Sequence, residues 1–364
     1  MKIVINILVV LLLLCSCASV VAPTGGDKDI DAPKVLKISV LENPKNVHEK
    51  SIVFEFDEYI QLNKWEEYFY ISPPLKKRAN KKIKGKILQI TIEDTLSNNT
   101  NYYIALNSCI KDNNEGNVLD TLSYELLNSS DSSNIIIVSG NLKDAYSLSD
   151  IENAWIMIFN ADVNDTLIFK TTPNYIARTD KKGFFYFPNL KDINYKIVAL
   201  TGFDFIYNKQ EKIAFRETRL NSKSDSFISL FAFDPIITID SIITKSIELE
   251  QDSKSISADS ILIIEEFPVG KLEIITNRFT NCIFQLLQNN KVVREIYFSN
   301  KPYLIDSIIP GEYQLKYITD NNQDSVWNTG NWENKIQPEK VYNYPSEITI
   351  RSNWDLELEW IIEE

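Results

Sequence analysis

The chain has 364 residues, of which 44% are hydrophobic and 24% are charged, and both values are ordinary for a globular protein. Its formal net charge is −12, which argues against a nucleic-acid partner, because such binding depends on Lys and Arg neutralising phosphates. The same charge argues against docking on anionic lipid by charge, so any membrane anchoring is expected to depend on a lipid group. The length predicts two or three domains.

The first sixteen residues (1–16) have the pattern of an export signal. Lys2 supplies a positive charge, and residues 3–14 form an apolar run that is interrupted only by Asn6. The run is shorter than the ~20 residues of a membrane-spanning helix, and it ends in small residues, as a signal peptide does.

The exit of this segment reads Leu14-Cys15-Ser16-Cys17, which resembles the lipobox of bacterial lipoproteins. The resemblance implies cleavage before Cys17, followed by acylation of its thiol and of the new amino group. More than one acyl chain holds a protein stably at a membrane, whereas a single chain binds marginally. Two alternatives stay open: Cys15 as the acylated residue, which places bulky Leu14 at the cleavage point, and an ordinary signal with incidental cysteines.

After Cys17, residues 17–31 are small, polar and contain glycine, which predicts a flexible lipidated tether. Residues 32–128 then show strand patterns, with apolar and polar residues alternating at 51–57, 86–92 and 101–106. Short strands separated by Asn, Asp and Pro predict a β-sandwich. Only 10 glycines serve the turns of the chain, so Asn must occupy many positions of positive φ.

A Ser- and Asn-rich segment at 128–134 predicts a linker with few contacts across it. A second block, 135–234, has strand patterns at 135–140, 154–159, 184–187 and 195–200, and a third block, 235–364, repeats part of this layout at 304–318. Tyr195 and Tyr313 stand at equivalent places in the two blocks. This predicts two related sandwiches, with coincidence among Tyr-rich strands as the alternative.

The segments carry resemblances to known families. The motifs Ala32-Pro33-Lys34-Val35, Ile71-Ser72-Pro73-Pro74 and Asn99-Thr100-Asn101-Tyr102 resemble a bacterial Ig-like domain of the type found in surface-layer (SbsA-type) and Bacteroidetes lipoproteins. Residues 135–200 resemble a carboxypeptidase-regulatory-like, transthyretin-type (prealbumin-like) sandwich through Thr179-Asp180 and Gly183-Phe184-Phe185. These resemblances imply an all-β protein of tandem β-sandwich domains, and such folds do not by themselves indicate a chemistry.

The sequence offers little catalytic chemistry. The one histidine, His48, lies in a polar segment that predicts an exposed turn, which leaves no His-dependent triad except one built on this residue. Phosphate loops, nucleophile elbows and helical zinc motifs are missing from the sequence. Glu55 and Asp57 imitate a glycosidase carboxylate pair, but their alternation on one strand favours a solvated face. We therefore expect no enzyme activity and no cofactor.

One segment has the oxygen spacing of a calcium loop. Asp320, Asn322, Asp324 and Asn328 occupy loop positions 1, 3, 5 and 9. However, Ser325 stands where the sharp-turn glycine belongs, and Asn331 replaces the bidentate acid. The loop is thus a weak calcium candidate, and an Asn-rich hairpin is favoured.

Aromatic residues and cysteines complete the candidates. Trp327, Trp332, Trp354 and Trp360 suggest a carbohydrate-stacking face, although core packing is the favoured explanation. An oxidising compartment would allow Cys109 and Cys282 to pair, but their separation favours two buried free thiols.

The sequence predicts a non-enzymatic, lipid-anchored protein of the cell envelope with a structural or protein-binding function. Its expected partners are the membrane and an envelope protein or glycan, with a glycan-binding lipoprotein as the alternative and an envelope enzyme as the third. Ala18 in place of an aspartate after the acylated cysteine favours the outer membrane.

Overall fold

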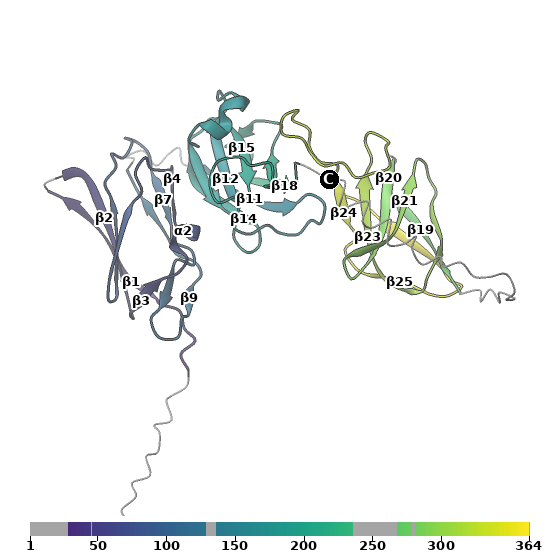
Figure 1. Ribbon diagram of the computed structural model, residues 1–364, viewed down its shortest axis with the longest axis horizontal. Helices are drawn as coiled ribbons and strands as arrows, with labels where there is room; N and C mark the ends of the chain where they lie inside the picture. Colours follow the sequence, from purple (N-terminus) through teal and green to yellow (C-terminus); the bar gives the residue numbers. More distant parts are fainter. Residues whose placement is uncertain (1–27, 45, 129–135, 236–267, 279–280, 364) are drawn as a thin grey trace, which may run out of the picture.

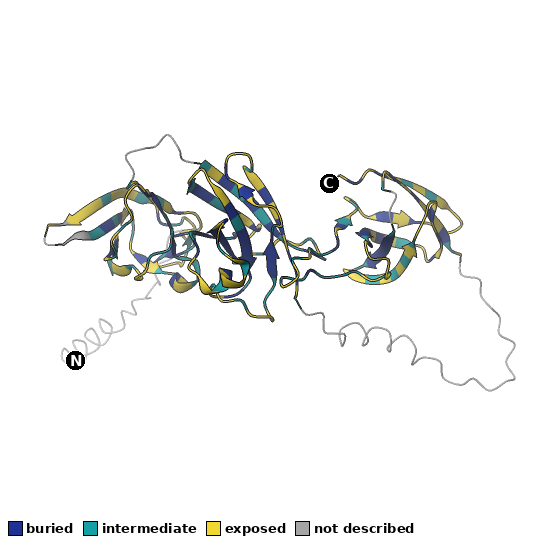
Figure 2. Cartoon of the chain, turned by 90° about the horizontal axis from the view of Figure 1, so that it is seen from above, coloured by how far each residue is buried: buried dark blue, intermediate teal, exposed yellow. Residues whose placement is uncertain are grey.

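The computed structural model describes residues 28–363 except 45, 129–135, 236–267 and 279–280, and it leaves out the side chains of 43 and 46–48. The predicted signal, Cys17, most of the tether and most of the linker therefore lie outside the described residues. The described chain is all-β and forms several sandwiches, which follow one another in a row (Figure 1). Buried residues gather in the strands inside the sandwiches, and exposed residues lie in the loops and at the outer edges (Figure 2). The predicted fold class is confirmed.

The first sandwich packs a sheet in the order β1-β2-β6-β5 against a second sheet, β10-β7-β4, and a small sheet β3-β8-β9 lies at one end. Ile52, Phe54 and Phe56 are fully buried, because the alternation of β2 directs them into the core. The elements are β1 (Val35–Asn43), β2 (Asn46–Phe56), β3 (Ile60–Leu62), α2 (Trp65–Tyr68), β4 (Tyr70–Ser72), β5 (Asn80–Lys84), β6 (Ile87–Ile92), β7 (Tyr102–Ala105), β8 (Ile110–Asp112), β9 (Val118–Leu119) and β10 (Ser123–Leu126).

The second sandwich packs the sheet β14-β11-β18 against β13-β12-β15-β16, with β17 also paired to β15. Strands β11 and β18 run parallel, and Gly140 lies where they meet: a Cβ there would stand 2.1 Å from the Ile228 carbonyl oxygen. The elements are β11 (Ile136–Asp144), β12 (Trp155–Asn160), η1 (Asp165–Lys170), β13 (Tyr175–Arg178), β14 (Phe184–Leu190), β15 (Asn194–Leu200), β16 (Ile213–Phe215), β17 (Leu220–Asn221) and β18 (Phe227–Ala232).

The third sandwich repeats this topology strand for strand. Its sheets are β22-β19-β26 and β21-β20-β23-β24, with β25 also paired to β23, and its first and last strands again run parallel. The elements are β19 (Gly270–Thr276), β20 (Cys282–Gln288), β21 (Lys291–Phe298), β22 (Tyr303–Ile308), β23 (Gly311–Thr319), β24 (Val341–Asn343), β25 (Ile348–Ile350) and β26 (Asp355–Trp360).

The second and third sandwiches also match at Tyr195 and Tyr313, the two tyrosines that the sequence places at equivalent positions. The Tyr195 hydroxyl donates to the Lys191 carbonyl oxygen at 3.0 Å, and the Tyr313 hydroxyl donates to the Ile309 carbonyl oxygen at 2.7 Å. Both bonds reach back four residues from the start of equivalent strands, β15 and β23. This is the arrangement of a tyrosine corner, which ties a strand to the turn before it.

Asparagine supplies the tight turns, as the low glycine content predicts. Asn99, Asn153, Asn289, Asn290 and Asn353 all have positive φ. Asn289 and Asn290, with φ of 50° and 61°, form the two-residue connection between β20 and β21. Two consecutive residues of positive φ match the twist of the strands that they join.

The first and second sandwiches share a packed interface. The buried ring of Tyr70 meets Trp155 edge to face, with ring centroids 5.8 Å apart. The backbone N–H of Ile176 donates to the Ser72 hydroxyl at 3.0 Å, and Arg178 donates to the carbonyl oxygen of Glu67. The expectation of few contacts across the linker is thus wrong, because aromatic residues at the rim of each sandwich bury one another.

Candidate functional site

The second and third sandwiches meet at the turn that follows β11. Tyr146 in this turn donates its hydroxyl to the Gln285 side-chain oxygen at 2.9 Å, and its ring packs against Trp327 with the ring centroids 4.9 Å apart and the planes tilted by 54°. Both partners belong to the third sandwich, and Gln285 is buried. The turn therefore connects the two bodies through one aromatic side chain.

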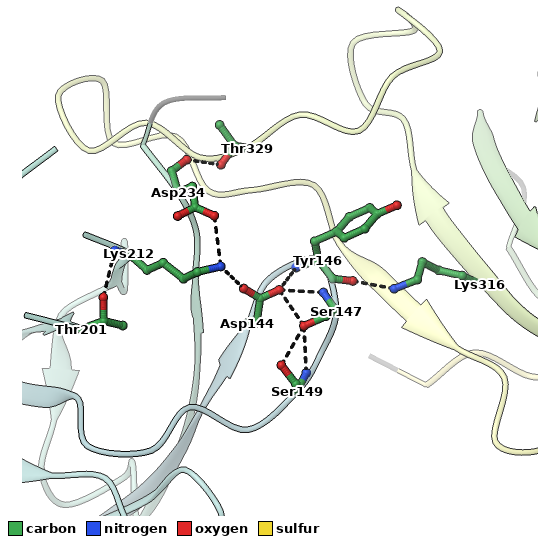
Figure 3. A network of polar contacts seen from close by, with 9 residues as sticks. All are labelled: Asp144, Tyr146, Ser147, Ser149, Thr201, Lys212, Asp234, Lys316 and Thr329. Carbon is green, nitrogen blue, oxygen red and sulfur yellow. Dashed lines mark hydrogen bonds and ion pairs between the residues drawn. The ribbon is translucent and has the colours of Figure 1, made fainter. Parts of the chain in front are cut away.

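A polar network sets the shape of this turn (Figure 3). Asp144 accepts the backbone N–H and the hydroxyl of Ser147 at 2.7 and 2.9 Å, and it forms an ion pair of 2.5 Å with Lys212. Lys212 also contacts Asp234 at 3.0 Å. Burial acts to raise the pKa of Asp144, but the bonds from Lys212 and Ser147 outweigh it and hold that pKa below its ordinary value.

Lys316 of β23 reaches the turn from the other side (Figure 3). Its ammonium donates to the Tyr146 carbonyl oxygen at 2.6 Å and lies 4.6 Å from the centre of the Tyr146 ring. Burial lowers the pKa of Lys316 to about 8, because a charged amine loses its hydration there. The carbonyl and the ring face replace part of that hydration.

The loop between β23 and β24 extends from the third sandwich onto the second. Trp332 packs on Phe215 and Phe169, each with ring centroids 5.2 Å away. The Trp327 indole N–H donates to the Glu339 carbonyl oxygen at 3.1 Å. These two tryptophans therefore serve the contact between sandwiches.

The four tryptophans proposed as a stacking face do not share one surface. Trp360 is buried in the core of the third sandwich, whereas Trp354 is 57% exposed. Trp327 and Trp332 lie at the interface described above. The favoured explanation, core packing, holds for Trp360, and two of the others fill an interface that the strand pattern does not reveal.

A cavity of about 790 Å³ opens between the second and third sandwiches. Four basic side chains line it, Arg216, Arg278, Lys335 and Lys340, together with the carboxylate of Glu217. Tyr342 and Phe231 add aromatic surface. The cavity thus has the composition that an anionic ligand with apolar faces requires.

The weak calcium candidate has its oxygens occupied by donors of the chain itself. Asp320 is buried and accepts the backbone N–H groups of Asp324 and Ser325 at 3.2 and 3.0 Å. Asp324 accepts the side-chain amides of Asn322 and Asn328, both at 2.8 Å. Among the described residues, no group of three or more His, Cys, Asp and Glu side chains is arranged to hold a metal ion.

We expect calcium to leave the melting temperature of the protein unchanged, because a cation would have to displace these N–H donors. An ion that binds only the folded state raises that temperature by mass action. Thermal unfolding in millimolar calcium, set beside the same scan with EDTA, measures the effect. A rise that disappears in Asp320→Ala and Asp324→Ala variants would show that the loop is a calcium site.

The two cysteines of the described chain are free and buried, as predicted. Cys109 lies in the first sandwich and Cys282 in the third. Burial raises the pKa of each thiol to about 12, so both stay protonated at neutral pH and are poor nucleophiles.

The expectations for Cys17 and His48 have different outcomes. Cys17 lies outside the described residues, so its acylation stays a prediction. His48 belongs to strand β2 and not to a turn, because the β1–β2 hairpin continues well beyond the apolar part of its strands.

In the part of the chain that is described, no helix has the length and apolar character needed to cross a membrane.

Tyr146 and Lys316 are the site residues that sequence reasoning missed. The two residues are 170 positions apart in the sequence, and the Lys316 amine contacts the backbone carbonyl of Tyr146. A contact to a backbone group does not depend on the partner's side chain, so no motif in the sequence indicates it.

The fold defines an all-β protein of several sandwich domains with an Ig-like domain near the N-terminus. A family model described as a bacterial Ig-like domain matches residues 29–126. That match covers the first sandwich, and further sandwiches follow it.

Comparison with solved structures gives distant similarities only. A minor pilin of Streptococcus agalactiae is 12% identical, with 62% of this chain and 94% of that chain covered and a TM-score of 0.19. An Escherichia coli alpha-2-macroglobulin structure is 9% identical, covering 85% of this chain and 96% of that chain at a TM-score of 0.20. Scores this low carry no argument about function. No curated protein matches the chain.

Proposed function

We propose that the protein is a non-enzymatic lipoprotein of the cell envelope, anchored in the outer membrane through acylated Cys17. It acts as a structural or protein-binding module that holds its sandwiches away from the membrane. The observation that supports this function is the row of sandwiches joined by packed interfaces, at Tyr70 with Trp155 and at Tyr146 with Lys316. Such interfaces favour one arrangement of the row, which suits a spacer.

The second and third sandwiches are, in this proposal, both carboxypeptidase-regulatory-like units. Their shared topology and paired tyrosine corners support a common origin. A repeated unit lengthens the row without requiring a new fold.

Cys17→Ser is expected to yield a protein that lacks acyl chains and leaves the membrane fraction or accumulates as precursor. The matched control is Cys15→Ser, which removes the neighbouring thiol and should leave acylation unchanged. Mass spectrometry and membrane sedimentation of both variants measure the outcome. If Cys17→Ser is processed normally and still sediments with membranes, the anchor is not at this residue.

A glycan-binding function is the second candidate, and the basic cavity between the second and third sandwiches favours it. Lys335, Lys340 and Tyr342 there offer cationic and aromatic contacts to an acidic sugar. A glycan array probed with the wild-type protein and with Lys340→Ala tests this function, which requires binding that the substitution weakens.

A further inference from the structure

A strongly basic segment stands out in this acidic protein. Residues 76–86 carry seven Lys and Arg side chains and no Asp or Glu, so the segment has a charge of +7 while the whole chain has −12. All seven residues are exposed, namely Lys76, Lys77, Arg78, Lys81, Lys82, Lys84 and Lys86. We name these seven residues the basic edge.

The basic edge follows one border of the first sandwich. Strand β5 is the outermost strand of the sheet β1-β2-β6-β5 and pairs only with β6. Lys82 and Lys84 are paired with Gln89 and Ile87, and these four residues lie on the outer face, because Leu88 and Ile90 between them point into the core. Lys82 and Lys84 are thus displayed on the outer face of the sheet.

Few acidic groups neutralise this surface. Glu66 forms ion pairs with Arg78 at 2.9 Å and with Lys81 at 2.7 Å. Glu93 and Asp94 at the end of β6 accept bonds from the Asn80 side chain and from backbone N–H groups. Among the described contacts, Lys76, Lys77, Lys82 and Lys84 make no ion pair.

One end of the basic edge, at Lys86, lies beside the point where the chain enters the fold. The Lys86 ammonium donates to the Asp57 carbonyl oxygen at 2.6 Å, and the Asp57 carboxylate accepts the backbone N–H of Lys34 at 2.8 Å. Lys34 lies three residues after the end of the predicted tether. Residues 18–31 span at most about 50 Å when fully extended, so an anchored Cys17 allows this edge to reach the membrane.

We propose that the basic edge binds the anionic headgroups of the membrane to which the protein is anchored, so that the first sandwich lies against the lipid along β5. This inference rests on the proposed lipid anchor for its location, but the binding itself needs no acyl chain. Basic side chains near a membrane gain from the negative surface potential, and a polybasic surface is an established second signal beside an acyl chain.

A structural explanation also exists for lysines on an outer strand, because charges there prevent pairing with another sheet. The two explanations make different predictions about the sign of the charge. Protection of the edge is retained when lysine becomes glutamate, whereas attraction to anionic lipid is reversed. Charge reversal therefore separates them.

The test uses the unacylated chain from residue 18 onward, which keeps every described residue. Its binding to vesicles of phosphatidylglycerol and phosphatidylethanolamine is measured by cosedimentation, beside vesicles of phosphatidylcholine alone. We expect binding to the anionic vesicles only, weakened by salt. Lys82→Gln with Lys84→Gln should weaken it about 30-fold, since each lysine contributes about fivefold.

Lys82→Glu with Lys84→Glu should abolish binding while the protein stays monomeric by light scattering. Lys181→Glu with Lys182→Glu, an exposed pair in the second sandwich, is the control with the same change of net charge, and it should bind as wild type does. The proposal is overturned by equal binding to both kinds of vesicle, by no binding to anionic vesicles, or by binding to a sulfated polysaccharide alone. Because no acyl chain is present, none of these results depends on Cys17.

Discussion

Trp155→Ala is expected to lower the free energy of unfolding of the second sandwich by about 3–5 kcal/mol, the usual cost of removing a large buried aromatic side chain. Trp155 is 7% exposed and contacts the Tyr70 ring at 5.8 Å and the Arg178 guanidinium at 4.3 Å. Its indole N–H also donates to the Phe203 carbonyl oxygen at 3.2 Å. The substitution leaves a cavity between two sandwiches and a guanidinium without its ring.

Urea unfolding followed by circular dichroism measures this loss, and limited proteolysis near residues 129–135 reports the loosened contact between the sandwiches. Trp354→Ala is the matched control, because this tryptophan is 57% exposed and surface substitutions usually change stability by less than about 0.5 kcal/mol. Equal effects of the two substitutions would contradict the assignment of Trp155 to the interface.

Tyr146→Ala is expected to weaken the coupling of the second and third sandwiches by about 2–4 kcal/mol. Loss of the hydroxyl leaves the buried Gln285 oxygen without this donor, at a cost of about 1–3 kcal/mol. Loss of the ring removes its contact with Trp327, worth about 0.5–1.5 kcal/mol, and uncovers the Lys316 ammonium. The backbone bond from Lys316 to residue 146 stays possible, so the turn itself is preserved.

Small-angle scattering should show a larger radius of gyration for Tyr146→Ala, and urea unfolding should separate into distinct transitions for the two sandwiches. Tyr146→Phe keeps the ring and removes only the hydroxyl, so only the loss of about 1–3 kcal/mol that belongs to the hydroxyl is expected. An unchanged radius and a single unchanged transition in Tyr146→Ala would mean that other contacts, such as those of Trp332, hold the sandwiches together.

Strands with one buried and one exposed face were predictable, and β2 is an example. Alternation in β2 places Ile52, Phe54 and Phe56 in the core, and a period of two cannot be satisfied by a helix. The kinship of the second and third sandwiches was visible in Tyr195 and Tyr313, since a tyrosine corner is a local device within four residues. Local patterns of this kind depend little on distant parts of the chain.

The contacts between sandwiches were not predictable in the same way. The Ser- and Asn-rich segment at 128–134 predicts a linker, but its composition says nothing about the surfaces on either side. Trp327 and Trp332 have the same residue type as Trp360, and only their position in the loop after β23 directs them toward the second sandwich. The calcium candidate shows the same limit, because the spacing of the oxygen side chains does not reveal which N–H groups already donate to those oxygens.

The sequence by itself determined the all-β class and the faces of strands such as β2, and it predicts an export signal, an acylated Cys17 and a relation between the second and third units. These follow from local periodicity and short motifs, whose physics acts within a few residues. The tertiary structure decided that Tyr146 and Lys316 join two sandwiches, that two tryptophans fill an interface, and that seven basic residues form one exposed edge beside the entry of the chain. Such features depend on which distant surfaces meet and on which strand is left at the border of a sheet, and no local pattern encodes either.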